Sequence, residues 1–212
     1  MHGKTTNEVF IRRFFFHSKS PSAISFKRII EESLTVKRRM LTDPTLQQNL
    51  TATVDLLTSV FKNRGKVLFC GNGGSASDAQ HLAAEFSGRF FLERAPLFAE
   101  ALHVNTSFLT AVSNDYGYEA AYARMVYAAG RAGDVLIAIS TSGNSPNILK
   151  AIAAAKECGM RVVGMTGKTG GKMHDLCDIL LKVPSESTPR IQEGHILLGH
   201  IFCELTERAV FR

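Results

Sequence analysis

Long apolar runs are missing from this sequence. No stretch approaches the ~18 consecutive apolar residues that a membrane-spanning helix needs. The short run Phe14–Phe16, beside two arginines, is far too short for the central region of a signal peptide, and no small-residue cleavage site follows it. We therefore expect a cytoplasmic protein that does not enter a membrane.

Closely spaced cysteines are also missing. The four cysteines all lie more than four residues apart, which excludes a zinc ribbon and a paired redox motif: Cys70, Cys158, Cys177 and Cys203. Cys70 and Cys203 have apolar neighbours, so buried free thiols are expected. Free thiols agree with a reducing compartment.

Most of the chain lacks the excess of basic residues that is typical of nucleic-acid binding. The net charge is +6, but residues 1–40 hold nine Lys and Arg against three Asp and Glu, whereas residues 41–212 hold sixteen of each. A basic leading segment is usually a solvated tail or an exposed helix face. We predict no nucleic-acid partner.

The N-terminal part divides into an extension and a helical region. Residues 1–22 are polar, basic and irregular, and predict a poorly ordered extension. Residues 23–212 predict a single domain that begins with a helical hairpin over residues 24–63. Asp43 and Pro44 are typical of the N-cap and first residue of the second helix.

After Gly65, short apolar segments alternate with helical patterns. Strands are predicted at 66–70, 98–102, 134–139, 161–165 and 179–183, and helices at 78–87, 106–113, 118–129, 146–158 and 190–210, with a helical turn at 173–177. This alternation predicts an α/β fold, a parallel sheet covered by helices on both faces. Ligands bind such sheets at the carboxyl ends of the strands, which points to the loops after Cys70, Ile139 and Met165.

The first of these loops, residues 71–77, contains Gly71, Asn72, Gly73, Gly74 and Ser75. Glycines let the backbone approach a ligand, and the start of a helix favours an anion, so the loop predicts a phosphate site. The loop also matches a loose dinucleotide fingerprint, but no carboxylate follows the second strand to hold a ribose.

The second loop is a cluster of hydroxyl groups. Its residues are Ser140, Thr141, Ser142, Gly143, Asn144 and Ser145, and Pro146 starts the next helix. Such a cradle at a helix N-terminus suits a phosphate monoester. The third loop contains Gly167-Lys168-Thr169, but Val162 stands where a Walker A loop requires glycine, so we discard it as a nucleotide site.

Candidate metal ligands and acid–base groups occur on two of the predicted helices. His81 and Glu85 lie four residues apart, and therefore on one helix face, where they could bind a metal or act as acid and base. The last helix carries Gln192, Glu193, His195 and His200. Its two histidines are either functional groups or core or interface residues, and the sequence does not choose between these interpretations.

Three segments together resemble the sedoheptulose-7-phosphate (phosphoheptose) isomerases, which carry a sugar isomerase (SIS) domain. They are Cys70–His81, Ser140–Ser145 and Arg190–His200, and the resemblance extends from about Ser25 to the C-terminus. It implies a flavodoxin-like, five-stranded parallel sheet sandwiched by helices, with N-terminal helices, in a homotetramer. The implied reaction converts sedoheptulose 7-phosphate to D-glycero-D-manno-heptose 7-phosphate, for bacterial surface heptose and lipopolysaccharide.

The resemblance also assigns residues to roles. It implies catalysis by Glu85 as base and His200 as acid, and one Zn²⁺ per subunit on His81, Glu85, Gln192 and His200. It implies substrate contacts by Asn72, Gly73, Gly74, Ser75, Glu85, Asn114, Asp115, Ser140, Thr141, Ser142, Ser145 and Gln192.

These assignments contain a geometric conflict and leave alternatives open. Gln192 and His200 are about 12 Å apart along a helix, so one metal could contact both only through a break at the helix start or through two subunits. Glu85 and His200 also cannot act freely as acid and base while tightly bound to zinc. The alternative functions are a non-catalytic SIS protein that binds the replication initiator and a sugar-phosphate sensor, but the presence of both Glu85 and His200 favours the enzyme.

Overall fold

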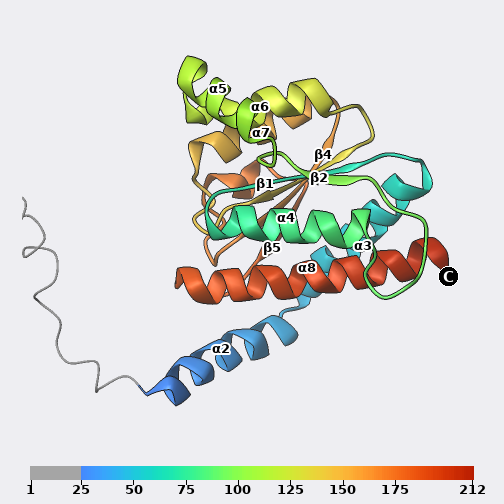
Figure 1. Cartoon of the computed structure of the whole chain (residues 1–212). Helices are drawn as coiled ribbons and strands as arrows, with labels where there is room; N and C mark the ends of the chain where they lie inside the picture. The colour runs from blue at the N-terminus through green and yellow to red at the C-terminus, as the bar shows by residue number, and fades with distance from the viewer. Residues whose placement is uncertain (1–24) are drawn as a thin grey trace, which may run out of the picture.

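The computed structural model describes residues 25–212, so the extension predicted over residues 1–22 lies outside them. Five parallel strands form one sheet between two layers of helices (Figure 1). The strands are β1 (Val67–Gly71), β2 (Ala99–Ala101), β3 (Val135–Ile139), β4 (Arg161–Thr166) and β5 (Ile179–Lys182). The helices are α2 (Phe26–Leu41), α3 (Pro44–Lys62), α4 (Gly74–Ser87), α5 (Thr106–Tyr116), α6 (Tyr118–Ala129), α7 (Pro146–Glu157), the short 3₁₀ helix η2 (Gly171–Asp175) and α8 (Thr188–Phe211).

The strand order is β2-β1-β3-β4-β5, the doubly wound order of flavodoxin-like folds, and it confirms the predicted fold class. The two strands that precede the candidate phosphate loops, β1 and β3, are direct neighbours. Their register pairs Gly71 with Ile139, so both strands end at the same level. This register places the two loops side by side.

Each face of the sheet packs against its own helical layer. Val67 and Phe69 of β1 belong to the core under α3, α4 and α8, whereas Leu68 and Cys70 belong to the core under α6 and α7. The side chains of a strand alternate between faces, so a strand that is covered on both sides must be apolar throughout. All five residues of β3, the middle strand, are fully buried.

The sequence predicted the first residue of α3 correctly, but not that of α4. Asp43 caps α3 as predicted, with its Oδ1 3.0 Å from the amide nitrogen of Leu46, and Pro44 follows in the first turn. Helix α4 instead begins at Gly74, four residues before its predicted start at Asp78. Gly73 has φ +55°, a conformation that lets the chain turn directly from β1 into the helix.

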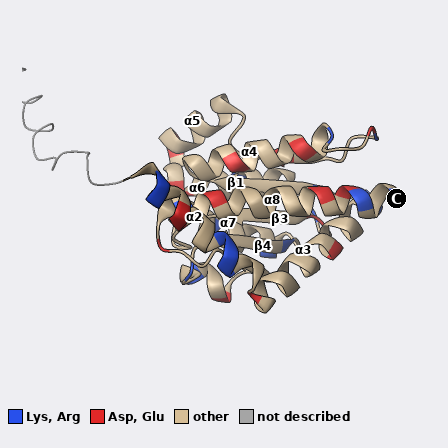
Figure 2. Ribbon diagram, turned by 90° about the horizontal axis from the view of Figure 1, so that it is seen from below, with Lys and Arg blue, Asp and Glu red and all other residues tan. Residues whose placement is uncertain are grey.

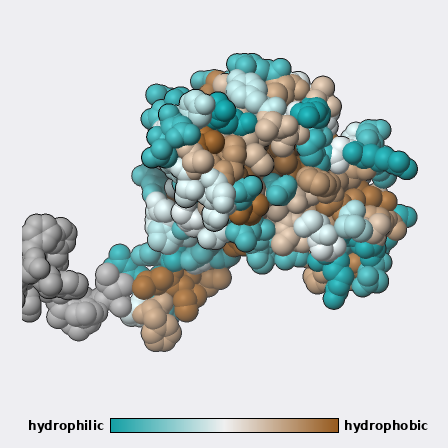
Figure 3. Space-filling model, turned by 45° about the horizontal axis from the view of Figure 1, so that its top comes forward, coloured by the Kyte–Doolittle hydropathy of each residue, from teal (hydrophilic) through white to brown (hydrophobic). Residues whose placement is uncertain are grey.

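Helices α2 and α3 do not form the hairpin predicted over residues 24–63. The two helices diverge from their junction, and α2 extends away from the body (Figure 1). The side chain of Ser33 on α2 donates to Glu193 Oε2 of α8 at 2.6 Å, and Arg190 donates to the carbonyl oxygen of Ile29 at 2.7 Å. Helix α2 thus packs on α8 and buries Val36 and Met40. The apolar residues of its first half, beside the grey atoms in Figure 3, remain exposed, with Phe26 78% exposed.

Helix α2 carries both acidic and basic residues (Figure 2). On α2, Lys27 pairs with Glu31 and Arg28 pairs with Glu32, each one turn apart. The first turns of α2 therefore carry their own counter-charges. Within residues 25–212, no helix combines the length and the apolar character needed to cross a membrane.

Candidate active site

The first loop is shaped by close backbone packing. A Cβ at Gly71 would lie 2.6 Å from the carbonyl carbon of Ser75, so only glycine fits at the end of β1. Gly74 lies against the side chain of Gln192 from α8, because a Cβ there would lie 3.0 Å from the Gln192 Cδ. The exposed amides of this loop and the N-terminus of α4 suit an anion.

The second loop gathers its hydroxyl groups around Ser140. The Oγ of Ser140 lies 3.1 Å from the Oγ of Ser145 and 3.4 Å from that of Ser142. The Ser142 hydroxyl also accepts a hydrogen bond from the amide of Asn144 at 3.2 Å. Ser145 is the N-cap residue of α7, but its hydroxyl does not cap the helix, so that group is free to contact a ligand.

Both loops line a single pocket of about 340 Å³, together with the start of α8. Its lining residues are Asn72, Gly73, Gly74, Ser75, Ile139, Ser140, Thr141, Ser145, Thr188 and Gln192. The pocket thus combines hydroxyl groups with the N-termini of α4 and α7, which together suit a phosphate group. Thr188 was not predicted from the sequence, because it precedes the expected start of the last helix.

Two histidines and a glutamate form a cluster further along α4. The Nε2 of His81 lies 3.3 Å from a Glu85 carboxylate oxygen and 3.0 Å from the Nε2 of His200 on α8. One ligand atom from each residue lies within 4.8 Å of the others. Tetrahedral ligands at ~2.1 Å from a zinc ion lie about 3.4 Å apart, close to the two separations measured from His81, so these three donors could hold one metal ion.

Asp78 lies one helical turn before His81. One of its carboxylate oxygens is buried and has no hydrogen-bond partner among the described residues. Burial raises the pKa of Asp78 to about 6, and the charge of nearby His81 opposes this increase. A carboxyl group with a raised pKa, that of Asp78, therefore lies beside the cluster.

Similarity to known proteins agrees with this geometry. The SIS domain family matches residues 30–167. A phosphoheptose isomerase from Aneurinibacillus thermoaerophilus is 51% identical over 186 residues, which are 88% of this chain and 94% of the relative. The chain belongs to the phosphoheptose isomerase family.

Solved structures of the family share the fold closely. The phosphoheptose isomerase from Neisseria gonorrhoeae is 44% identical, with a TM-score of 0.81 over 86% of this chain and 97% of the other. The phosphoheptose isomerase from Francisella tularensis is 36% identical, with a TM-score of 0.82 over 86% and 96% of the two chains. The family resemblance inferred from the three motifs is therefore confirmed.

The family resemblance assigned Gln192 to the metal site, and Asn114 and Asp115 to the substrate site. In the structure, these three residues lie apart from the others assigned to those sites. Helix α8 runs unbroken from Thr188 to Phe211, so a break at its start does not bring Gln192 to the cluster. Gln192 lies in the pocket between the two loops instead, about 12 Å along the helix from His200. Asn114 and Asp115 are exposed at the end of α5, where they bond to each other at 2.9 Å and do not line the pocket.

The two histidines of α8 have different surroundings. His195 is fully buried, and its Nε2 lies 3.1 Å from the carbonyl oxygen of Thr166. Burial lowers the pKa of His195 to about 4, against the opposing effect of that hydrogen bond. His195 is thus a neutral core residue, whereas His200 joins the cluster.

A hydrogen-bond network behind the first loop could not be predicted from the sequence. The side-chain amides of Asn72 and Asn147 bond reciprocally, at 2.9 and 2.8 Å, and Tyr118 donates to Asn72 Oδ1 at 2.8 Å. Tyr122 donates to the carbonyl oxygen of Gly71, and burial raises its pKa. The network ties β1 to α6 and α7, but nothing in the sequence distinguishes Asn147 from other polar residues of a helix.

Proposed function

We propose that this chain converts sedoheptulose 7-phosphate to D-glycero-D-manno-heptose 7-phosphate through an enediol, for bacterial surface heptose. One observation carries the proposal. Glu85 and His200 meet in a cluster on the helix whose N-terminus lines the hydroxyl-rich pocket. The relatives described above are phosphoheptose isomerases, which agrees with the proposal.

The separation of pocket and cluster supports a long sugar phosphate. His81 is about 10 Å along α4 from Gly74, and helix side chains lean toward the N-terminus, which here means toward the pocket. The phosphate and the carbonyl of a heptulose 7-phosphate are at opposite ends of the sugar. A phosphate held at Ser140 and Ser145 would leave the carbonyl end to extend toward Glu85.

The residues suit each proton transfer of an aldose–ketose isomerisation. The Glu85 carboxylate would remove a proton from carbon 1, and the electron pair of that C–H bond would form the enediol double bond. His200 would give a proton to the oxygen on carbon 2 and accept one from the oxygen on carbon 1. Return of the proton from Glu85 to carbon 2 would complete the aldehyde.

His81, Glu85 and His200 would hold one zinc ion. Bound zinc would polarise the sugar carbonyl and lower the pKa of the adjacent C–H bond. Glu85 has two carboxylate oxygens, so one can face the metal while the other faces the substrate. We include Gln192 as a ligand only from the partner subunit of an assembly, because it lies too far along α8 within one chain.

The proposal includes a homotetramer in the cytoplasm. The exposed apolar residues of α2 support assembly: Phe26, Ile29, Ile30, Leu34 and Leu41. An apolar groove of about 320 Å³ between α2, α3 and α8, lined by Leu50 and Ile201 among others, extends this surface. Four free cysteines support a reducing compartment.

The test is turnover of sedoheptulose 7-phosphate by purified protein, with and without added zinc. Wild type should produce the aldose, and Glu85→Gln, which keeps the shape but loses the base, should be at least about 100-fold slower. Glu157→Gln, a surface change on α7, should match wild type. The proposal fails if wild type shows no turnover under any metal condition, and binding of the replication initiator by such an inactive chain would favour the non-catalytic alternative.

A further inference from the structure

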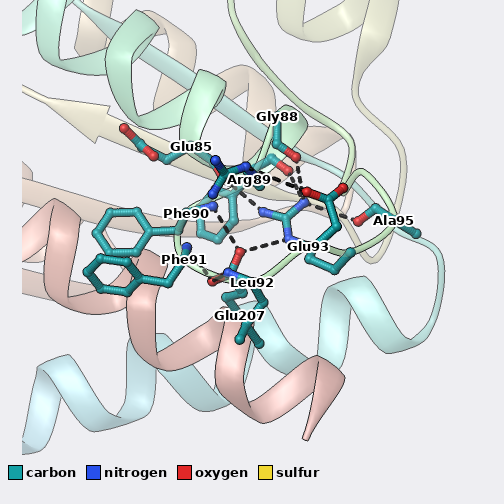
Figure 4. A network of polar contacts seen from close by, with 11 residues as sticks. Glu85, Gly88, Arg89, Phe90, Phe91, Leu92, Glu93, Ala95 and Glu207 are labelled. Carbon is teal, nitrogen blue, oxygen red and sulfur yellow. Dashed lines mark hydrogen bonds and ion pairs between the residues drawn. The ribbon is translucent and has the colours of Figure 1, made fainter.

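The segment after α4 is held by one buried carboxylate, that of Glu207 on α8. One of its oxygens accepts from the amide of Phe90 at 2.9 Å, and the other accepts from the amides of Phe91 and Leu92 at 2.8 and 2.9 Å (Figure 4). Arg94 adds a fourth donor, with its Nε 2.9 Å from the first oxygen. Every donor comes from a stretch of five residues.

Arg94 uses the rest of its guanidinium to close the end of α4. Its Nη2 donates to the carbonyl oxygen of Glu85 at 2.9 Å, and its Nη1 donates to those of Phe86 and Gly88 at 2.7 and 3.0 Å. These carbonyls have no partners within the helix, so the cation also complements the negative end of the helix dipole. A lysine could not reproduce this forked set of bonds.

The ion pair is almost completely withdrawn from water. The side chains of Arg94 and Glu207 are 2% and 1% exposed. Burial by itself raises the pKa of Glu207, but the three amides and Arg94 together lower it to about 2. A buried charge pair is stable only when it is fully hydrogen bonded, and loss of either partner leaves the other uncompensated. Removal of either side chain should therefore leave an uncompensated buried charge at the end of α4.

The network contacts both sides of the His81–Glu85–His200 cluster. The ring of Phe90, whose amide is bound by Glu207, packs against the ring of His200 with centroids 5.8 Å apart. Arg94 binds the backbone of Glu85 itself. Glu207 lies seven residues, or two turns, after His200 on the same face of α8. One ion pair thus fixes the end of α4 relative to α8 where their side chains meet.

We propose that Glu207 and Arg94 are positioning residues, which hold Glu85 and His200 at the separation that metal binding and proton transfer require. The inference rests on the proposed function for its catalytic part and on the geometry of the cluster for its metal-binding part. Residues that orient metal ligands without contacting the metal typically contribute 10- to 100-fold in affinity or activity. The phosphate pocket, at the other end of α4, should not depend on them.

The test compares three variants with wild type. Glu207→Gln removes the charge but keeps the shape, and Phe90→Leu removes the ring against His200 but keeps the amide bound by Glu207. The matched control is Glu204→Gln, on the same helix, where Glu204 pairs with Arg208 near the surface. Metal-free protein is titrated with zinc against a chromophoric chelator, inorganic phosphate binding is measured by calorimetry, and kcat and KM are determined with sedoheptulose 7-phosphate.

We expect Glu207→Gln to lose at least about tenfold in zinc affinity and in kcat, with phosphate affinity and KM within about twofold of wild type. Phe90→Leu should lose less zinc affinity and less kcat than Glu207→Gln. If Glu207→Gln does not fold, the comparison of Phe90→Leu with wild type tests the inference. Unchanged zinc affinity and kcat in folded variants, or an equal loss of phosphate affinity, overturns the inference. If wild type binds zinc but does not turn over the sugar, the proposed function fails while the zinc titration still decides the positioning role.

Discussion

The Nε2 atoms of His81 and His200 face each other at 3.0 Å across the interface between α4 and α8, although 119 residues separate them in the chain. The centroids of the two rings lie 5.1 Å apart, and a carboxylate oxygen of Glu85 lies 3.3 Å from the Nε2 of His81. Two imidazole nitrogens this close can form a hydrogen bond with each other or bind one cation. The packing of α4 on α8 thus creates a site that neither helix has alone.

Removal of one imidazole should abolish metal binding at this cluster. For His81→Ala, we expect the zinc content to fall from about one ion per chain toward zero after dialysis, because two remaining ligands hold zinc weakly. Elemental analysis of the dialysed protein measures this change. His174→Ala, which removes an exposed histidine, is the control and should retain the metal. Full zinc content in His81→Ala would place the metal elsewhere.

The buried hydroxyl of Ser140 should contribute mainly to phosphate affinity. Ser140→Ala removes the group that bonds to Ser142 and Ser145 at the pocket, and a hydrogen bond to a charged group is worth about 1.5–3 kcal/mol. We therefore expect KM to rise at least about tenfold with a much smaller change in kcat. Steady-state kinetics measures both constants. Ser107→Ala, at an exposed position on α5, should leave KM unchanged.

A variant of α2 tests whether its apolar face is an assembly surface. Phe26 and Ile30 are 78% and 53% exposed, so their replacement by serine should cost the folded chain little. The double variant should shift the mass measured by light scattering after gel filtration from the tetramer toward smaller species. Phe98→Ser, at a 59% exposed position before β2, is the control. A tetramer that survives the double variant would contradict a role of α2 in assembly.

The sheet and the phosphate loops were predictable because their signals are local. The apolar strands are buried on both faces, and the glycine and serine loops follow β1 and β3 directly. The divergence of α2 was not predictable, because helical spacing shows that a face is apolar and leaves open what covers it. The same holds for Glu207, whose four donors come from residues more than a hundred positions away. The first residue of α4 could not be predicted from the sequence, because glycine, a poor helix former, occupies its first turn.

The buried imidazole of His195 should make the protein less stable in mild acid. Its folded pKa, about 4, lies below the unfolded value of ~6.5, so the unfolded state binds the proton more strongly. Stability from this residue is complete above pH ~6.5 and is lost as the pH falls toward 4.

Between pH 7.5 and 5.5 this single group should remove about 1 kcal/mol from the free energy of unfolding. Denaturant unfolding at the two pH values measures the loss, and His195→Gln should show a loss that is smaller by that amount. His174→Gln, at an exposed position, should behave as wild type, which separates the effect of the buried imidazole from that of other titrating groups. Equal pH dependence in wild type and His195→Gln would mean that the pKa of His195 is the same in the folded and the unfolded protein.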